Sequence, residues 1–288
     1  MKTLKTYWRG ILVFALVLGN LFVWYVIAVE SRDGILTVSF LDVGQGDAIF
    51  IDGPSGIQVL IDGGRGKKVL TQLGQVMPFY DHSIDLILAT HPDQDHIEGL
   101  IGVEERYKTK VFIEPNLITD KSFQTSLRKL ASERGARELS AQAGQKINLG
   151  NGATLTILFP DQNVSNWQKD TNMASVIAIL EYGKSKFLFT GDSPIAIEEY
   201  LTGKLGSKLD VDVLKVGHHG SRTSSSEYFL AATTPSIAII SAGKDNSYGH
   251  PHKETLEHLA AVKAQVINTA DVGTITIKSD GVSLKLTN

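Results

Sequence analysis

Four side chains that can bind a metal lie within six residues, in the segment His91-Pro92-Asp93-Gln94-Asp95-His96. The apolar run at 84–90 before it is typical of a buried strand, so the segment lies where a strand passes through a loop into a helix. Histidine and carboxylate together suit zinc, manganese or iron. Because the neighbours Asp95 and His96 diverge, the spacing predicts two adjacent ions with further ligands from elsewhere. A solvated acidic loop that caps the helix is the alternative, but capping does not require histidine at both ends.

Metal-capable side chains follow other predicted strands as well. They stand at five successive strand ends, namely Asp62, residues 91–96, Asp192, His218 with His219, and His250. The recurring order is a strand, a loop with histidine or aspartate, and then a helix. Loops over a rigid sheet commonly carry catalytic side chains in this way. Two mostly antiparallel sheets with helices outside would bring these ends together.

Hydrophobic periodicity and turn residues place the remaining elements. Strands are expected at 35–41, 48–52, 57–61, 84–90, 110–114, 153–159, 176–182, 186–189, 211–216 and 236–240, with short strands in 265–286. Helices are expected at 67–77, 97–107, 122–134, 195–201 and 253–262. Residues 160–171 are polar and predict a loop at the rim of the site. The sequence contains neither an internal repeat nor a segment of clearly different composition after the anchor, so residues 31–288 are expected to form one domain.

Residues 1–30 have the pattern of a membrane anchor. Three basic residues within the first nine precede an uncharged stretch at 11–29, and charge returns at Glu30, Arg32 and Asp33. A basic flank before an apolar span of this length predicts a single-pass helix with the N-terminus in the cytoplasm and the remaining chain outside. The alternative is a signal peptide cleaved after Ala28, which would leave residues 29–288 as a secreted protein.

Composition narrows the chemistry of the remaining chain. The protein has 288 residues, 42% hydrophobic residues and no cysteine, so a zinc site would have to use histidine and carboxylate. Residues 1–30 hold three basic and one acidic side chain of the total of 28 and 31, which leaves 25 against 30 and a net charge of −5. A domain of this sign lacks the broad basic surface of a tight duplex binder, so any contact with nucleic acid should be local.

The motifs resemble a known fold. The order Asp62-Gly63, His91-x-Asp93-x-Asp95-His96 and Thr190-Gly191-Asp192 is similar to that of the metallo-β-lactamase fold superfamily. A closer resemblance, over residues 35–286, is to the metallo-hydrolase domain of the ComEC family of competence DNA-uptake proteins. It rests on Leu41-Asp42-Val43-Gly44-Gln45-Gly46-Asp47, Asn172-x-x-Ser175, Phe189-Thr190-Gly191-Asp192, His218-His219-Gly220-Ser221 and Tyr248-Gly249-His250-Pro251.

The resemblance implies an α/β fold, an αββα sandwich, with a dinuclear site at one edge. His91 with Asp93 would bind one ion, Asp95 with His96 the other, Asp192 would bridge or complete the pair, and His218 would be the late histidine ligand with His219 and His250 close by. Asp62 would orient ligands or water, and His219 or His250 would protonate the leaving oxygen. Substrate binding or support of the ligands is expected for Asp47, Asn172, Ser175, Lys215 and Ser221, with Lys215, Arg222 and Lys244 as candidates for phosphate contact.

The chain also departs from these families. The superfamily has histidine where Asp93 stands and another before the bridging aspartate, whereas this chain has no histidine between His96 and His218. Asn172 could occupy that neighbourhood. Oxygen ligands shift the expected pair of divalent ions from zinc toward manganese. ComEC proteins carry a multi-helix channel, and one apolar span cannot form a transport pore.

The expected function is a membrane-tethered, extracytoplasmic, metal-dependent phosphodiesterase or nuclease that uses a metal-activated water. Its expected substrate is single-stranded DNA or another phosphodiester. A different extracellular ester, a cell-wall phosphodiester, a lactam or a lactone is the alternative, because one fold hosts many chemistries. A non-enzymatic module with a decayed metal site is a third hypothesis.

Overall fold

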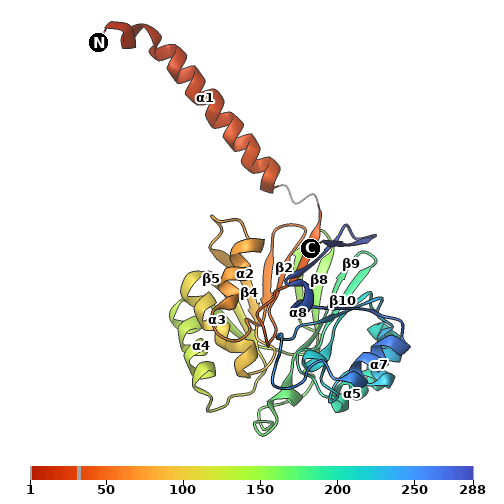
Figure 1. The fold of residues 1–288 in the computed structure, drawn as a ribbon. Helices are drawn as coiled ribbons and strands as arrows, with labels where there is room; N and C mark the ends of the chain where they lie inside the picture. Colours follow the sequence, from red (N-terminus) through yellow and green to blue (C-terminus); the bar gives the residue numbers. More distant parts are fainter. Residues whose placement is uncertain (1, 31–33, 288) are drawn as a thin grey trace. The chain divides into compact units, whose positions relative to one another are not determined.

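The computed structural model describes residues 2–30 and 34–287 and divides into two compact units, Met1–Gly34 and Ile35–Asn288 (Figure 1). The first unit is one helix, α1 (Lys2–Glu30). Its segment Tyr7–Trp24 is long and apolar enough to cross a membrane, a test that a signal sequence also passes. Arg32 and Asp33, which belong to the expected outer flank, lie outside the described residues.

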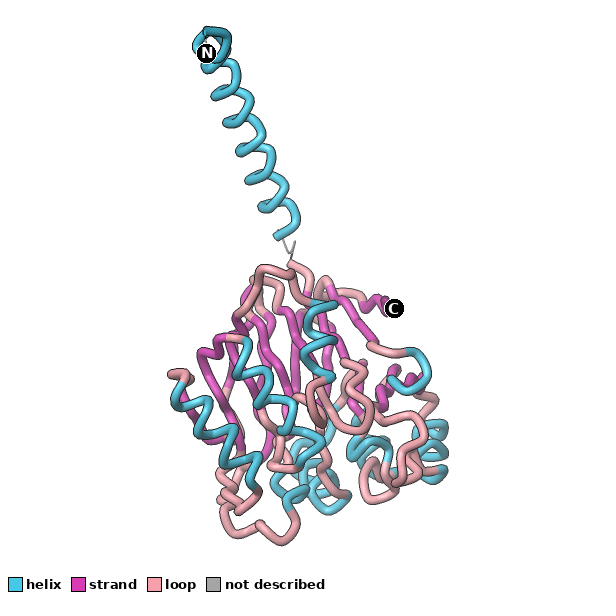
Figure 2. The backbone as a smooth tube through the Cα atoms, turned by 60° about the vertical axis from the view of Figure 1, so that its left-hand side comes forward, coloured by secondary structure: helices cyan, strands magenta, loops and turns pink. Residues whose placement is uncertain are grey.

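The second unit contains two sheets that pack face to face (Figures 1 and 2). Sheet A has the strand order β15-β14-β1-β2-β3-β4-β5-β6. These strands are β15 (Leu284–Thr287), β14 (Ile275–Ser279), β1 (Leu36–Phe40), β2 (Ile49–Asp52), β3 (Gln58–Ile61), β4 (Ser83–Leu88), β5 (Lys108–Glu114) and β6 (Arg137–Ser140). Sheet B has the order β13-β12-β11-β10-β9-β8-β7. Its strands are β13 (Gln265–Asn268), β12 (Ile237–Ile240), β11 (Val213–Lys215), β10 (Ser185–Phe189), β9 (Ile177–Tyr182), β8 (Ala153–Phe159) and β7 (Lys146–Gly150).

Helices cover the outer face of each sheet (Figure 1). Against sheet A lie α2 (Lys68–Val76), α3 (Gln94–Arg106) and α4 (Ser122–Glu133), and against sheet B lie α5 (Ile195–Leu205), α6 (Glu227–Thr233) and α7 (Lys253–Ala261). The short helices are α8 (Thr269–Val272), η1 (Thr171–Ala174), η2 (Gly206–Leu209) and η3 (Gly217–Gly220). The αββα sandwich predicted from the sequence is therefore confirmed.

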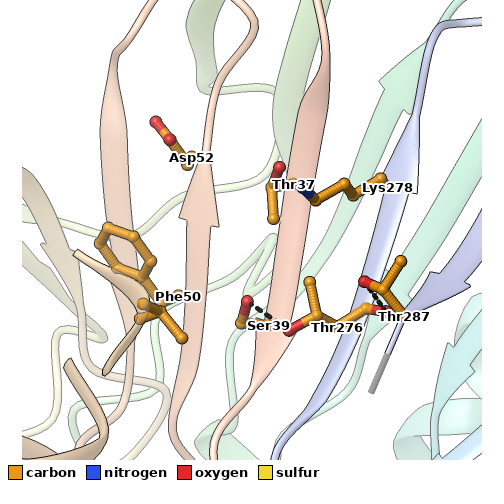
Figure 3. A pocket seen from close by; sticks show the side chains of 8 residues that line it. Thr37, Ser39, Phe50, Asp52, Thr276, Lys278 and Thr287 are labelled. Atoms are coloured by element: carbon orange, nitrogen blue, oxygen red, sulfur yellow. Dashed lines mark hydrogen bonds between the residues drawn. The ribbon is translucent and has the colours of Figure 1, made fainter. Parts of the chain in front are cut away.

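Alternation along the strands explains the layers. In β1, Leu36, Val38 and Phe40 point into the core between the sheets, whereas Thr37 and Ser39 point to the outer face. A hollow of about 380 Å³ lies on that outer face, and Ser39 Oγ lies 3.0 Å from Thr276 Oγ1 across it (Figure 3). Phe50 and Val76, the last residue of α2, line the hollow beside these polar side chains.

The expectation of mostly antiparallel sheets holds only narrowly, because seven strand pairs of the described residues are antiparallel and six are parallel. Strands β3-β4-β5-β6 run parallel in sheet A, as do β10-β11-β12-β13 in sheet B. A helix joins β4 to β5 and β10 to β11, and such a crossover returns the chain in the same direction. The sequence analysis also missed the short elements β6, β7 and α6.

Candidate metal centre

The predicted site residues follow the carboxyl ends of parallel strands. Asp62 follows β3, residues 91–96 run from the loop after β4 into the first turn of α3, Asp192 follows β10, and His218 and His219 follow β11. In a parallel pair the carboxyl ends lie at the same edge of the sheet, and in open α/β sheets ligands bind at this edge. The two sheets bring both groups of strand ends together.

Asp192 lies at the centre of the group and is 3% exposed. Its Oδ1 is 3.3 Å from His96 Nε2. Its Oδ2 is 3.4 Å from His219 Nε2, 3.6 Å from His218 Nε2 and 4.0 Å from His91 Nε2. Four imidazoles therefore converge on one buried carboxylate, as a shared metal ligand requires.

Asp62 fixes the orientation of two of these imidazoles. His96 donates from Nδ1 to Asp62 Oδ2 over 2.7 Å, which leaves the lone pair on Nε2. Asp62 also accepts from the Thr90 hydroxyl at 2.6 Å and from the Thr90 backbone N–H at 2.7 Å. Since this hydroxyl donates to Asp62, it accepts from His91 Nδ1 at 3.0 Å, and the lone pair of His91 is again on Nε2. The sequence analysis missed Thr90, although it directly precedes His91.

Asp47, which pairs with Lys215, contacts His219 on its Nδ1 side. His219 Nδ1 donates to the Ser241 carbonyl at 2.9 Å and lies 3.3 Å from Asp47 Oδ1, so Nε2 again faces Asp192. Ligand atoms of Asp47, His96, Asp192 and His219 lie within 4.8 Å of one another. Asp47 nevertheless stands on the Nδ1 side of His219, which makes it a positioning residue.

Lys215 is fully buried, with Nζ 2.7 Å from Asp47 Oδ2 and a hydrogen bond of 3.0 Å to the Val216 carbonyl. Its expected role in phosphate contact therefore does not fit the structure. The alternative role, support of the ligands, does.

Gly46 explains how Asp47 reaches the site. Gly46 has a φ of +121°, and a Cβ atom there would lie 2.0 Å from the Asp95 carbonyl oxygen. Without that atom, the loop after β1 closes on the first turn of α3, and Asp47 N–H donates to Asp95 O at 3.3 Å.

Asp93 and Asp95 form the more open side of the site, with side chains 31% and 27% exposed. Asp95 Oδ2 is 3.5 Å from His219 Nε2, and Asp93 Oδ2 is 4.0 Å from His91 Nε2. The other Asp93 oxygen accepts from Lys121 at 2.5 Å and from the Thr171 hydroxyl. Asp95 therefore faces His219 across the site, whereas the sequence paired it with His96.

The two late histidines differ in burial. His219 is 1% exposed and lies deep in the site, whereas the His218 side chain is 27% exposed at its rim. His218 Nδ1 is 3.1 Å from Thr223 Oγ1, which is 3.0 Å from Ser221 Oγ. Both imidazoles lie near Asp192, and that of His219, for which the sequence predicted proton donation, is the more buried of the two.

His250 lies beside these rings, with centroids 5.5 Å from His218 and 6.3 Å from His219. Burial and the neighbouring imidazoles lower the pKa of His250 to about 4. At neutral pH this side chain is uncharged. A neutral ring carries no extra proton for a leaving oxygen, so the proton-donating role that the sequence predicted for His250 does not fit.

Ser175 and Asn172 support the bridging position. The Ser175 hydroxyl accepts from Asp192 N–H at 3.3 Å, and Ser175 N–H donates to the Asn172 carbonyl at 3.0 Å. Both residues lie in or next to η1, whose Thr171 holds Asp93. The polar segment expected at the rim thus contacts a candidate ligand through Thr171.

The donor set fits a metal ion. Within residues 34–287, Nε2 of His91, His96 and His219 and Oδ1 of Asp192 are buried and lack a hydrogen-bond partner. Buried polar atoms are normally hydrogen-bonded. The imidazole lone pairs that face the Asp192 carboxylate would repel it unless a cation lay between them. Imidazole nitrogens held through Nδ1 are a common arrangement for metal ligands.

Protons would compete for the same atoms. Burial lowers the pKa of His96 and His219, but nearby carboxylates outweigh it and raise both well above the ordinary value. Burial raises the pKa of Asp192, but His219 and His96 outweigh burial and lower this pKa well below its ordinary value. His91 behaves differently, because burial and the charge of His96 lower its pKa. Metal binding is therefore expected to release protons.

Replacing Asp62 by alanine is expected to weaken metal binding by about 10- to 100-fold, because His96 and Thr90 lose their common acceptor. Titration of the metal-free protein with Mn²⁺, followed by bound metal, measures the affinity. Asp271, exposed in α8, offers a matched control as Asp271→Ala. Unchanged affinity in Asp62→Ala would contradict the positioning role.

Glu198 anchors the loop that follows the late histidines. This residue of α5 is fully buried and accepts from Ser225 N–H at 2.9 and 2.7 Å and from Ser226 N–H at 3.3 Å. Burial raises the pKa of Glu198 to about 8, while the N–H groups act in the opposite direction. At pH values between 4.5, the ordinary pKa of glutamate, and about 8, the folded state holds a proton that the unfolded state has released.

Stability should therefore fall as pH rises through that window, by on the order of 3 kcal/mol from this group. The variant Glu198→Gln has no titrating group at this position. The difference in unfolding free energy, variant minus wild type, should therefore increase by that amount between pH 5 and pH 8. Urea unfolding of both proteins at the two pH values gives the difference. A difference independent of pH would show that Glu198 stays ionised in the fold.

Comparisons with known proteins agree with this architecture. No protein-family model matches the sequence. ComE operon protein 3 of Bacillus subtilis is 29% identical over 272 residues, which are 88% of this chain and 34% of that protein. Recombination protein 2 of Haemophilus influenzae is 31% identical over 244 residues, or 83% and 28% of the two chains. The chain thus spans about a third of the length of these relatives.

Solved structures show the fold. CmlA, a diiron β-hydroxylase from Streptomyces venezuelae, superposes with a TM-score of 0.56 at 15% identity and covers 85% of this chain and 54% of its own. The metallo-β-lactamase fold protein YhfI from Bacillus subtilis gives 0.52 at 12% identity, covering 81% and 95%. These likenesses show that the chain has the metallo-β-lactamase fold. Its sequence is similar to the ComEC-family competence proteins, which confirms the resemblance that the motifs predicted.

Proposed function

We propose that this chain is a membrane-tethered, extracytoplasmic hydrolase that cleaves phosphodiester bonds with the help of divalent metal, and that single-stranded DNA is its substrate class. The observation that carries the proposal is the convergence of three buried Nε2 lone pairs, from His91, His96 and His219, on Asp192. The similarity to competence proteins supports the substrate class.

The candidate metal ligands form a buried group and a more exposed group. His91, His96, His219 and Asp192 would hold metal from the buried side, and Asp93, Asp95 and His218 from the open side. Two zinc or manganese ions there would lower the pKa of bound water and neutralise charge on a phosphoryl oxygen. Asp62 and Asp47 would hold the imidazoles of His96 and His219, and uncharged His250 lies beside His218 and His219.

The N-terminal helix supports the proposed location. The apolar segment Tyr7–Trp24, preceded by basic residues, supports a single-pass anchor with the hydrolase unit outside the cytoplasm. Cleavage after Ala28 would instead release a secreted enzyme. The length of the N-terminus in protein from membrane fractions, measured by mass spectrometry, decides between these two outcomes.

The test of the activity uses the full chain purified in detergent. Chelated protein should be inactive toward bis(p-nitrophenyl) phosphate and a single-stranded oligonucleotide, and added Mn²⁺ or Zn²⁺ should restore cleavage. Asp95→Ala should lose the restored activity, whereas Asp271→Ala should keep it. Equal turnover with and without metal, or in Asp95→Ala, would contradict the proposal.

The net charge of −5 in residues 31–288 favours a second candidate, a smaller or less charged substrate. A cell-wall phosphodiester or another ester, a lactam or a lactone would fit the same centre. One metal-loaded preparation tested on a panel of these substrates distinguishes the candidates by their kcat/KM. Elemental analysis of the same preparation tests the hypothesis of a decayed site, which about two ions per chain would contradict.

A further inference from the structure

A pocket of about 450 Å³ adjoins the open side of the metal centre. It contains both exposed candidate ligands together with two cations and two aromatic rings: Asp93, Asp95, Arg65, Lys121, Phe123 and Tyr248. This volume lies within the range of small-ligand pockets, which is about 300 to 1,000 Å³. A ligand here would lie against the metal site itself.

The charges of the pocket favour an anion once metal is present. Lys121 pairs with Asp93 at 2.5 Å, whereas Arg65 is exposed and makes no ion pair or side-chain hydrogen bond within the described part of the chain. The two cations balance the two carboxylates, so a divalent ion bound at Asp93 or Asp95 would leave the pocket positive. The planar guanidinium of an unpaired arginine matches phosphate in a bidentate manner.

The aromatic side of the pocket is presented by a braced loop. Asn246 Oδ1 accepts from the backbone N–H of Tyr248 at 3.2 Å and of His250 at 3.0 Å. The Tyr248 ring stacks on His250, with centroids 5.6 Å apart and planes at 20°, and the residue remains 61% exposed. A single exposed aromatic needs no explanation, but here a braced ring and an unpaired arginine line one pocket beside the metal site. Single-strand binding sites combine basic side chains with aromatic rings in this way.

We propose that this pocket binds one unpaired nucleotide next to the scissile phosphodiester, with its phosphate on Arg65 and Lys121 and its base stacked on Tyr248. The inference rests on the proposed function and adds a substrate subsite to it. Each base has a flat face, so stacking tolerates any sequence, and it is accessible only where the base is unpaired. The pocket would distinguish a nucleotide from a phosphodiester without a base.

The test compares two oligomers of equal length on the full chain in detergent, one of oligothymidylate and one abasic with the same phosphates. Tyr248→Ala is expected to raise KM for oligothymidylate about tenfold and to leave KM for the abasic oligomer within about twofold. Tyr248→Phe keeps the ring and should behave as wild type. Arg65→Ala should raise KM for both oligomers about tenfold, because it removes a phosphate contact.

Tyr228 is a matched control, since it is 55% exposed on α6 and does not line the pocket. A readout independent of turnover is photo-cross-linking of a 5-iodouracil oligonucleotide, which should label the peptide with Tyr248 and lose this product in Tyr248→Ala. Cleavage of both oligomers by Tyr248→Ala at wild-type KM, or a cross-link elsewhere, would overturn the inference while the proposed function stands. If wild-type protein cleaves neither oligomer, the proposed function fails, and the cross-link alone decides where a nucleotide binds.

Discussion

Replacing Asp192 by asparagine is expected to remove metal from the site and to lower hydrolysis by at least about a thousandfold, or about 4 kcal/mol in activation free energy. Asp192 is the one side chain within 4.0 Å of Nε2 of His91, His96, His218 and His219 in the part of the chain that the structure describes. Asparagine keeps the shape but removes the charge that a shared ligand provides. No other carboxylate could replace it without moving a strand end.

The measurement pairs elemental analysis with turnover of bis(p-nitrophenyl) phosphate under saturating Mn²⁺. Asp271→Asn is the matched control, because Asp271 is exposed far along the sequence in α8. Wild-type metal content together with lost activity would assign Asp192 a role in the chemical step and not in metal binding. Wild-type values for both quantities would remove Asp192 from the centre of the site.

The strand-end positions of the site residues could be predicted because the signal is local. An apolar run followed at once by histidine and aspartate marks a strand that ends in a polar loop, as β4 and β10 do. Which ends meet depends on sheet topology, and the sequence analysis underestimated the parallel pairs. The strand–loop–helix order around β4 and α3 already contained that information, since a helix between strands favours a parallel return.

The choice between His218 and His219 was not available from spacing. Both residues have left-handed backbone, with φ of 47° and 56°. The alternation of a strand and the turn of a helix predict where side chains point only for regular φ and ψ. Two consecutive left-handed residues follow neither rule, so the sequence could place the pair at the site but could not say which ring is buried.

Long-range contacts explain why the remaining roles could not be predicted from the sequence. Asp47 and Lys215 pair across 168 positions of the chain, and Thr171 reaches Asp93 from the polar segment before β9. No periodicity records such contacts. A lysine at the end of an apolar strand is usually at the surface, and only the structure shows that β11 ends inside the core.

Lys215→Met is expected to destabilise the protein by about 3 to 5 kcal/mol, because it removes the lysine partner of the buried Asp47 carboxylate. The Lys215 side chain is 0% exposed and that of Asp47 is 2% exposed. Burial raises the pKa of Asp47, but Lys215 and His219 outweigh it and lower the pKa below its ordinary value, so the carboxylate stays ionised at neutral pH. Urea unfolding of the full chain in detergent measures the loss, and Lys208→Met at an exposed lysine should leave stability within about 0.5 kcal/mol of wild type.

The double variant Asp47→Leu with Lys215→Met separates stability from function. Replacing both partners of a buried ion pair by apolar side chains is often neutral, so most of the lost stability should return. Metal affinity and hydrolysis should stay reduced, because His219 has lost the carboxylate beside its Nδ1. Recovery of activity along with stability would mean that the pair serves the fold alone and that the Ser241 carbonyl suffices to hold the ring.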